Sequence, residues 1–267
     1  MSLICSIFLA QDLLAAPVQV DSELLFLVDV SSSIDDSNFS TMMTGYGNAM
    51  KSGEILAAIE SGNLGKIAVS VLFFSSKTKQ SIGVEWMEIS DFTSAQAFSN
   101  LITSVVRPFT GRTGIGSAIE FATPLFGTET GGAENGFESV VQIIDVAGDG
   151  IDNHSASRSL NYSDNVAAAR DAALASGVEM VNGLALNDPS GELAEYYSSY
   201  VIGGSAAGTQ SFVESAAGFE DFEAALLRKL LKEIKAGQDA SVIAAIPEPS
   251  MGLLALLTTV IFLKRRR

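Results

Sequence analysis

The sequence predicts an α/β domain with a doubly wound, mostly parallel sheet and helices on both faces. Runs of consecutive apolar residues alternate with amphipathic helical segments along the 267-residue chain. Consecutive apolar positions indicate strands that are buried on both faces, as in parallel sheets. Strands and helices that alternate form such a sheet by right-handed crossovers. Acidic and hydroxyl residues follow several strands directly, at the edge where sheets of this kind bind ligands.

Each predicted element has its own pattern. Four apolar runs predict buried strands, at 24–29, 66–74, 139–146 and 178–186. Looser alternation predicts an edge strand at 80–89, with Trp86 in the core, and a last strand at 209–214. Apolar residues at helical spacing predict helices, at 34–50, 54–60, 94–106, 117–126, 164–176, 192–200 and 219–234.

Composition narrows the classes of function. The net charge is −15, and 47% of the residues are hydrophobic, which is typical of a globular protein. Residues 17–246 carry 12 Lys and Arg against 29 Asp and Glu. This acidic body disfavours nucleic acid and anionic lipid as partners. Cys5 is the single cysteine and His154 the single histidine, which argues against a multi-histidine metal site and against a histidine-based triad.

Oxygen-bearing side chains follow the first buried strand in the pattern Asp29-x-Ser31-x-Ser33. Carboxylate and hydroxyl oxygens are hard ligands that suit Mg²⁺, Mn²⁺ or Ca²⁺. The same pattern is equally typical of a helix N-cap. Taken alone, it leaves both interpretations open.

Two later loops carry similar side chains. Thr113 lies in the glycine-rich loop 109–117, which predicts a capped turn, a phosphate-binding loop or an additional oxygen ligand. No G-K-[ST] sequence follows, so the loop is not a P-loop. Asp149 lies between two glycines just after the strand 139–146. Asp152 and the residue after it resemble part of a calcium loop, but the full ladder of an EF-hand is absent. We therefore expect three loops to bring two carboxylates and three hydroxyls to one edge of the sheet.

These five residues, in this order, resemble the metal-ion-dependent adhesion site (MIDAS) of von Willebrand factor type A domains. The motifs VDVSSSID at 28–35, TGIGSAI at 113–119, IDVAGDG at 144–150, VIGG at 201–204 and RKLLKEI at 228–234 are similar to a bacterial family of such domains without assigned function. The resemblance covers about 21–236 and implies a Rossmann-like von Willebrand A fold.

The resemblance also implies a metal and a partner. Ser31, Ser33 and Thr113 would contact Mg²⁺, with Mn²⁺ or Ca²⁺ as alternatives, and Asp29 and Asp149 would bind it directly or through water. Two carboxylates neutralise one divalent cation, so the metal keeps affinity for a further anionic oxygen. We therefore expect a non-enzymatic adhesion module that binds a Glu or Asp carboxylate of a protein partner.

Two other functions remain open. Mg²⁺ with two aspartates also serves hydrolysis of phosphoesters. Against a hydrolase, Arg112 is the only basic residue beside a ligand in the sequence, and no general base stands near. The third function is a structural matrix protein with an inactive metal site.

The chain ends indicate export. Residues 1–16 predict a signal peptide, although it lacks a basic start and contains Asp12; a buried N-terminal helix is the alternative. Residues 247–267 begin with Pro-Glu-Pro, continue with a short apolar segment at 251–263 and end in four basic residues. This tail resembles the PEP-CTERM sorting signal of Gram-negative bacteria, with 237–246 as spacer. It implies a short transmembrane segment, processing by an exosortase, and a membrane-anchored precursor that becomes a cell-surface or matrix protein.

Overall fold

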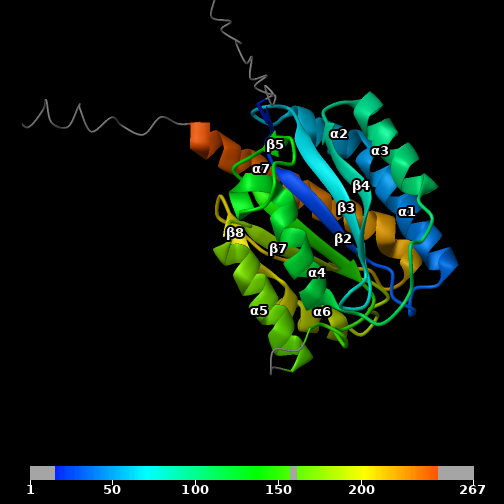
Figure 1. Ribbon diagram of the computed structural model, residues 1–267. Helices are drawn as coiled ribbons and strands as arrows, with labels where there is room; N and C mark the ends of the chain where they lie inside the picture. The colour runs from blue at the N-terminus through cyan, green and yellow to red at the C-terminus, as the bar shows by residue number, and fades with distance from the viewer. Residues whose placement is uncertain (1–15, 157–160, 246–267) are drawn as a thin grey trace, which may run out of the picture.

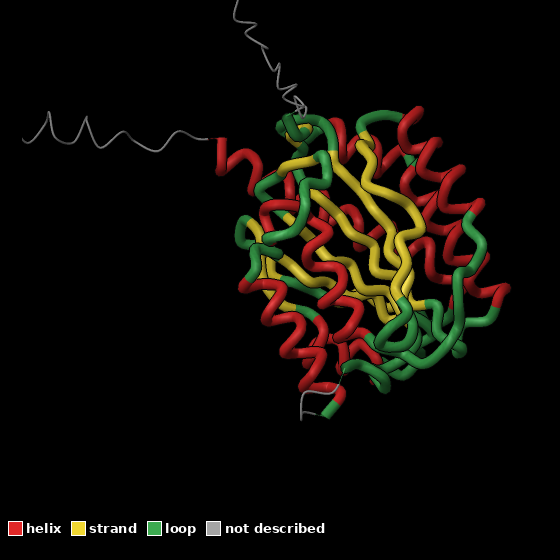
Figure 2. The backbone as a smooth tube through the Cα atoms, in the orientation of Figure 1, coloured by secondary structure: helices red, strands yellow, loops and turns green. Residues whose placement is uncertain are grey.

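The computed structural model describes residues 16–156 and 161–245. One sheet lies between two layers of helices (Figures 1 and 2). The α/β fold class, with helices on both faces of a mostly parallel sheet, is therefore confirmed. The sorting signal at 247–267 and residues 1–15 of the predicted signal peptide lie outside the described residues.

Four parallel strands form the centre of the sheet, in the order β3 (Ile67–Phe74), β2 (Glu23–Asp29), β6 (Gln142–Gly148) and β7 (Met180–Ala185). At one edge, β4 (Gln80–Ile89) pairs antiparallel with β3, as expected for an edge strand. At the other edge, β10 (Val213–Ser215) is parallel to β7 and β8 (Gly203–Ala206) is antiparallel to it. β9 (Thr209–Gln210) closes a hairpin with β8, and β1 (Val18–Gln19) pairs with β5 (Phe137–Glu138) in a small separate sheet.

The side chains of β2 show why its apolar residues are consecutive. Leu24, Phe26 and Val28 belong to the core on one face of the sheet. Leu25 and Leu27 belong to the core on the other face. Because successive strand residues point to opposite faces, a strand between two helical layers needs apolar residues at every position.

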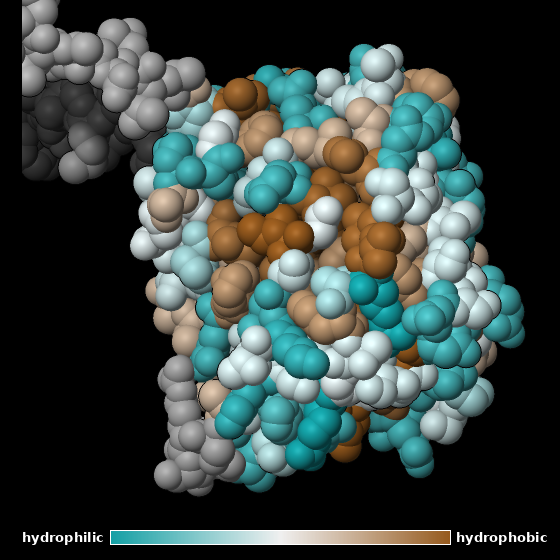
Figure 3. Space-filling model, turned by 45° about the vertical axis from the view of Figure 1, so that its right-hand side comes forward, coloured by the Kyte–Doolittle hydropathy of each residue, from teal (hydrophilic) through white to brown (hydrophobic). Residues whose placement is uncertain are grey.

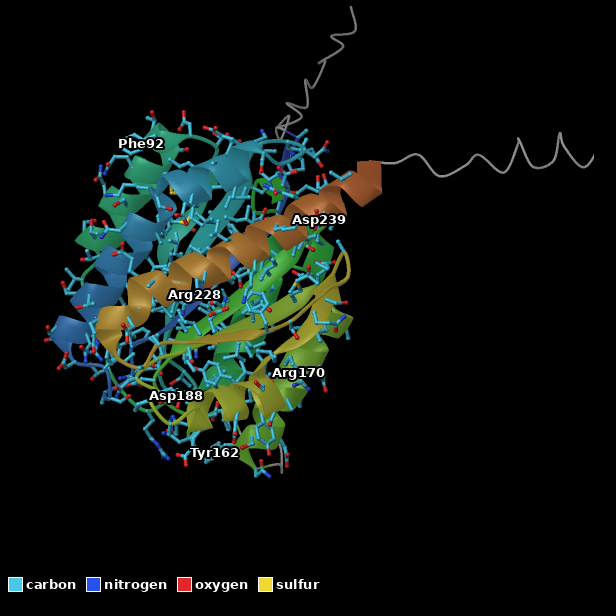
Figure 4. The ribbon with its side chains drawn as sticks, turned by 180° about the vertical axis from the view of Figure 1, so that it is seen from behind. Phe92, Tyr162, Arg170, Asp188, Arg228 and Asp239 are labelled. Atoms are coloured by element: carbon cyan, nitrogen blue, oxygen red, sulfur yellow. The ribbon has the colours of Figure 1, made fainter. Side chains whose placement is uncertain are left out.

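Two layers of helices cover the two faces of the sheet. The first core is covered by α1 (Asp36–Met50), α2 (Gly53–Glu60), α3 (Phe92–Ser104) and α7 (Phe222–Ala245), which crosses the sheet diagonally in Figure 4. The second core is covered by α4 (Ile115–Ala122), α5 (Tyr162–Ala175) and α6 (Glu192–Tyr196). Short irregular helices follow or precede three of these, at η1 (Thr123–Thr130), η2 (Tyr197–Val201) and η3 (Phe219–Asp221).

The second helical layer leaves the outer part of the sheet partly uncovered. Among the described residues, no α-helix lies over β4 on the side of α4 (Figure 1), and apolar surface gathers in the middle of the face shown in Figure 3. Trp86 of β4 is only partly buried, against Phe126, and its indole nitrogen donates to the carbonyl of Leu125 at 2.8 Å. The prediction that Trp86 is a core residue is thus correct only in part.

Several boundaries differ from the prediction. The last helix was expected to end at Ile234, but α7 continues to Ala245, so the described part of the expected spacer is helical. The expected strand 209–214 is two short strands, and β8 was not expected. The expected helix 117–126 begins at Ile115 and changes into η1 at Thr123. Among the described residues, no helix is long and apolar enough to cross a membrane; the segment expected to do so, 251–263, is not among them.

A buried ionic cluster fixes α7 to the sheet. The Lys229 ammonium lies 2.6 Å from Asp145 Oδ1 and 2.5 Å from Glu233 Oε1, and all three side chains are fully buried. Asn182 of β7 donates to Glu233 Oε1 at 2.9 Å. Burial raises the pKa of Glu233 to about 7, because desolvation outweighs the attraction of Lys229. Since buried charges are unfavourable unless they are paired, this cluster specifies how α7 packs.

Candidate metal centre

The loop between β2 and α1 holds three of the five expected ligands. β2 ends at Asp29, and α1 begins at Asp36. The N-cap of α1 is Asp35, whose Oδ1 accepts from the amide of Asn38 at 2.8 Å. Asp29, Ser31 and Ser33 therefore do not cap this helix, which was the alternative interpretation of their pattern. Their side chains remain available for another purpose.

A chain of hydrogen bonds joins four of the expected ligands. Asp29 Oδ1 accepts from the amide of Ser31 at 2.7 Å, and the hydroxyl oxygens of Ser31 and Ser33 lie 3.1 Å apart. The Ser33 hydroxyl donates to Asp149 Oδ1 at 2.6 Å. β2 and β6 are adjacent parallel strands, so their carboxyl ends deliver Asp29 and Asp149 to the same edge.

Thr113 is placed beside this group by its backbone. Its amide donates to Asn153 Oδ1 at 3.1 Å, and its carbonyl accepts from the amide of Asn153 at 2.9 Å. A Cβ atom built on Gly150 would lie 3.8 Å from the Thr113 hydroxyl. Thr113 therefore lies next to the Asp149 turn. All five residues expected from the sequence lie at the same edge of the sheet.

The charge of Arg107 offsets the burial of the two carboxyl groups only in small part. Asp29 is fully buried, and its Oδ2 has no hydrogen-bond partner. Burial, together with the nearby charge of Asp149, raises the pKa of Asp29 to about 7, against the hydrogen bonds from Ser31 and the charge of Arg107. Burial also raises the pKa of Asp149. A divalent cation would offset both desolvation and repulsion, so the residues present fit such an ion.

The floor of this group is tightly packed. A Cβ atom built on Gly148 would lie 2.9 Å from the Tyr197 hydroxyl and 3.0 Å from Asp29 Oδ2. Tyr197 is fully buried, and its hydroxyl has no hydrogen-bond partner. Glycine is therefore required at 148 for the strand to pass this close to the carboxylate of Asp29.

Arg107 is a residue of this region that sequence reasoning missed. Its Nη2 donates to the carbonyls of Val30 at 2.8 Å and Ser31 at 2.6 Å, and its Nη1 lies 3.1 Å from Asp36 Oδ1. It holds the backbone of the ligand loop from a position 76 residues away from Ser31. No local pattern marks it, because the contact arises only when the chain folds.

Further basic residues lie nearby. The Lys79 ammonium donates to the carbonyl of Thr110 at 2.8 Å, and Arg112 Nε donates to Asn153 Oδ1 at 3.3 Å. Lys77 is exposed in the same β3–β4 turn. Arg112 is the only basic residue beside a proposed ligand in the sequence, but the fold also brings Arg107 and the β3–β4 turn to the same edge.

Asp152 holds backbone amides in place with its carboxylate. Its Oδ2 accepts from the amide of Gly116 at the start of α4, at 3.0 Å, and its Oδ1 accepts from the amides of His154 at 3.1 Å and Ser155 at 3.0 Å. These contacts anchor the N-terminus of α4, in keeping with the absence of an EF-hand pattern. Within residues 16–156 and 161–245, no three His, Cys, Asp or Glu side chains are grouped to hold a metal. The candidate centre has instead two carboxylates and three hydroxyls.

Comparison with known families identifies the chain. Residues 19–238 match the family described as "Protein of unknown function (DUF1194)". The chain belongs to the DUF1194 family. No curated protein matches its sequence.

Solved structures share the fold of this DUF1194 domain. Proximal thread matrix protein 1 from the mussel byssus, in a structure with a zinc-occupied MIDAS motif, matches with a TM-score of 0.51 and 18% identity over 82% of this chain and 49% of that chain. The pilus adhesin SpaC from Lactobacillus rhamnosus GG, in its open conformation, matches with 0.54 and 17% over 82% and 30%. A von Willebrand factor type A protein from Catenulispora acidiphila matches with 0.52 and 13% over 80% and 43%.

These matches establish the von Willebrand A fold. The DUF1194 chain spans about half or less of the length of each of these proteins. At such identities the likeness concerns the fold alone.

Proposed function

We propose that the DUF1194 chain is an exported adhesion module that binds a divalent cation at its MIDAS-type site and, through it, an acidic group of a protein partner. Asp29, Ser31, Ser33, Thr113 and Asp149 would hold the cation. The observation that carries the proposal is the buried, unpartnered Oδ2 of Asp29 at one end of the hydrogen-bonded chain to Asp149. When bound, the cation supplies an electrophilic centre for a carboxylate oxygen.

The chemistry of the site favours a hard cation. All five side chains offer oxygen, which suits Mg²⁺ first and Mn²⁺ or Ca²⁺ as alternatives. The zinc-occupied MIDAS motif of the mussel protein supports a divalent metal in this fold without selecting the ion. Ser33 is exposed and Asp149 half-buried, so a partner's carboxylate can reach this side of the group.

The cellular setting is part of the same proposal. The PEP-CTERM-like tail would direct the precursor to an exosortase, with the membrane contacted through residues 251–263 before processing. The mature protein would stay at the cell surface or in the extracellular matrix. A pilus adhesin and a thread matrix protein among the proteins of similar fold are in keeping with this setting.

One observation favours a second candidate, a metal-assisted phosphoester hydrolase. Arg107, Arg112 and Lys79 lie near the site, as they would around a phosphate. Each of them, however, donates to a protein carbonyl or amide oxygen. Hydrolysis of a phosphoester that is lost in Asp149→Ala would support this candidate.

A pull-down tests the adhesion proposal. Wild-type protein is expected to retain a partner from envelope and matrix extracts in Mg²⁺ and to lose it in chelator, and Asp29→Ala is expected to retain none. Asp171→Ala on the exposed surface of α5 is the matched control and should behave as wild type. Equal capture by wild type in Mg²⁺ and in chelator would contradict the proposal.

A further inference from the structure

A groove lies next to the candidate metal centre, between α1 and the segment that leaves α3. In Figure 1 this segment descends beside α1 toward the loops at the carboxyl edge of the sheet. The groove has a volume of about 600 Å³. Pockets of about 300–1,000 Å³ are typical for ligands of the size of a few residues or a drug. The groove is therefore large enough for a bulky side chain together with its peptide backbone.

The floor of the groove is apolar, and part of its wall is exposed to solvent. Phe39 and Met43 of α1 are almost fully buried and belong to the core. Val105 and Phe109 are partly buried and pack against the same core. Val106 lines the groove with 85% of its surface exposed, the largest exposed fraction among the large hydrophobic residues described. Such exposure is unfavourable in water, so apolar contact at this wall would be favourable.

Arg107 connects the groove to the metal centre. It lines the groove together with Asp36, and it also donates to the carbonyl of Ser31, whose hydroxyl belongs to the candidate site. Lys79 donates to the carbonyl of Thr110, another lining residue. Arg107 therefore links the lining of the groove to the loop that carries Ser31, so the groove lies beside the proposed carboxylate site.

The charge at this edge of the sheet selects the partner. The chain as a whole has a net charge of −15, yet Lys77, Lys79, Arg107 and Arg112 lie in the two segments beside the candidate centre. The same edge carries Asp29, Asp35, Asp36, Asp149 and Asp152, which these basic residues balance in part. With the proposed divalent cation added, this edge becomes the place on an otherwise acidic surface that attracts an acidic peptide, because local positive charge steers anionic ligands.

We infer that the groove binds a large apolar side chain, aromatic or aliphatic, that lies close in sequence to the acidic residue recognised at the metal centre. The ligand is a peptide segment of a protein partner with one Asp or Glu and one bulky apolar residue nearby. This inference rests on the proposed function for the acidic residue. The apolar contact would provide affinity and specificity beyond the carboxylate, which any acidic protein offers.

A displayed peptide library tests the inference with the full chain. Random peptides with a fixed central glutamate are selected in Mg²⁺ on wild type and on two groove variants. Ser40→Trp fills the groove from an exposed position of α1, and Val106→Glu adds a negative charge to its exposed wall. Leu101→Glu is the matched control, because Leu101 is 49% exposed on α3 and does not line the groove.

The inference predicts a defined pattern of enrichment. Wild type and Leu101→Glu should enrich peptides with an aromatic or large aliphatic residue near the glutamate by about tenfold or more, as burial of one such side chain allows. Ser40→Trp and Val106→Glu should lose this preference and keep the Mg²⁺ affinity of wild type in calorimetry, because neither residue is a proposed ligand.

Three other results would overturn the inference, and each has a different consequence for the proposed function. Mg²⁺-dependent enrichment without a preference near the glutamate would overturn the groove and leave the proposed function standing. Absence of any Mg²⁺-dependent enrichment would overturn both. A dimer in light scattering that Ser40→Trp dissociates would show that a second copy of the chain occupies the groove, against the inference.

Discussion

Asp29 combines features that a purely structural residue would avoid. Its carboxyl group is fully buried, one oxygen accepts from Ser31, and the other has no partner. Unpaired buried acids are unfavourable, and structural carboxylates normally accept hydrogen bonds at both oxygens. At the residue scale, the proposed cation explains why such a group lies at the end of a buried strand.

Gly148 offers a test in which no proposed ligand is substituted. Gly148→Ala introduces a Cβ atom 2.9 Å from the Tyr197 hydroxyl and 3.0 Å from Asp29 Oδ2, so the carboxylate must move. We expect Mg²⁺ affinity, measured by calorimetry, to fall by about tenfold or more, because misplaced ligands lose well over 1.4 kcal/mol of binding.

The control for this change is Gly53→Ala. A Cβ atom on Gly53, the first residue of α2, meets nothing within 4 Å. Alanine there should leave Mg²⁺ affinity unchanged and raise the free energy of unfolding by about 0.5–1 kcal/mol. Unchanged affinity in Gly148→Ala would show that the position of Asp29 does not matter for binding.

The attachment of α7 is a feature at the scale of elements. Its apolar face packs on the sheet through Phe222, Leu226 and Leu230, and Lys229 lies between Asp145 of β6 and Glu233 of its own helix. The opposing charges lie in one desolvated cluster. Removal of its single cation leaves two buried carboxyl groups without a positive partner.

Lys229→Met is expected to lower the free energy of unfolding by about 3 kcal/mol or more at pH 8, because buried charges are left unpaired. Urea denaturation measures this change. Lys235→Met, on the same helix, is the matched control; its side chain is 72% exposed and pairs with Asp239, so less than about 1 kcal/mol should be lost. Equal effects of the two substitutions would show that the cluster does not stabilise the packing of α7.

The long strands were predictable, but the smaller elements at one edge of the sheet were not. Runs such as 66–74 are apolar at almost every position because both faces of β3 are buried. β8 contains Gly203 and Gly204, and it pairs with β7 through only two residues, so no periodicity marks it. The end of α7 was predicted eleven residues too early, at residue 234, because Lys-Ala-Gly-Gln-Asp at 235–239 interrupts the apolar pattern of the helix. In the structure the final turns of α7 lie beside α2, where the side chain of Gln238 donates to the carbonyl of Ala58.

At the scale of the whole molecule, several buried acids determine how stability depends on pH. Burial raises the pKa of Glu23 from 4.5 to about 7, despite hydrogen bonds from Asn135, Ser139 and Gln142. Between these values the folded state retains a proton that the unfolded chain has released. Stability from this group is therefore fully present below pH 4.5 and is lost as the pH rises through about 7.

Glu23→Gln should remove this dependence. In chelator, wild type is expected to lose up to about 3 kcal/mol relative to Glu23→Gln between pH 5 and pH 8, measured by urea denaturation. Glu85→Gln, at an exposed position of β4, is the control and should follow wild type. A constant difference between wild type and Glu23→Gln across this pH range would refute the assignment.

The five proposed ligands could be predicted from local patterns in the sequence, but the basic residues and the groove beside them could not. Asp29, Ser31, Ser33, Thr113 and Asp149 follow strands or precede a helix, where local patterns indicate ligands. Arg107, Lys79 and the groove beside them depend on how the segment after α3 folds against α1. That arrangement follows from tertiary packing, which no local pattern contains.

The central claim is that Asp29 and its neighbours bind a divalent cation, and thermal unfolding of Asp29→Asn tests it most directly. At a Mg²⁺ concentration of 100 times the dissociation constant, wild type should gain about 2.7 kcal/mol, a rise in Tm of about 5–10 °C over the protein in chelator. Asp29→Asn should fold with at least the stability of wild type in chelator, because a buried charge is gone, and should gain nothing from Mg²⁺. The same rise in Tm in both proteins, or none in wild type, would contradict the claim.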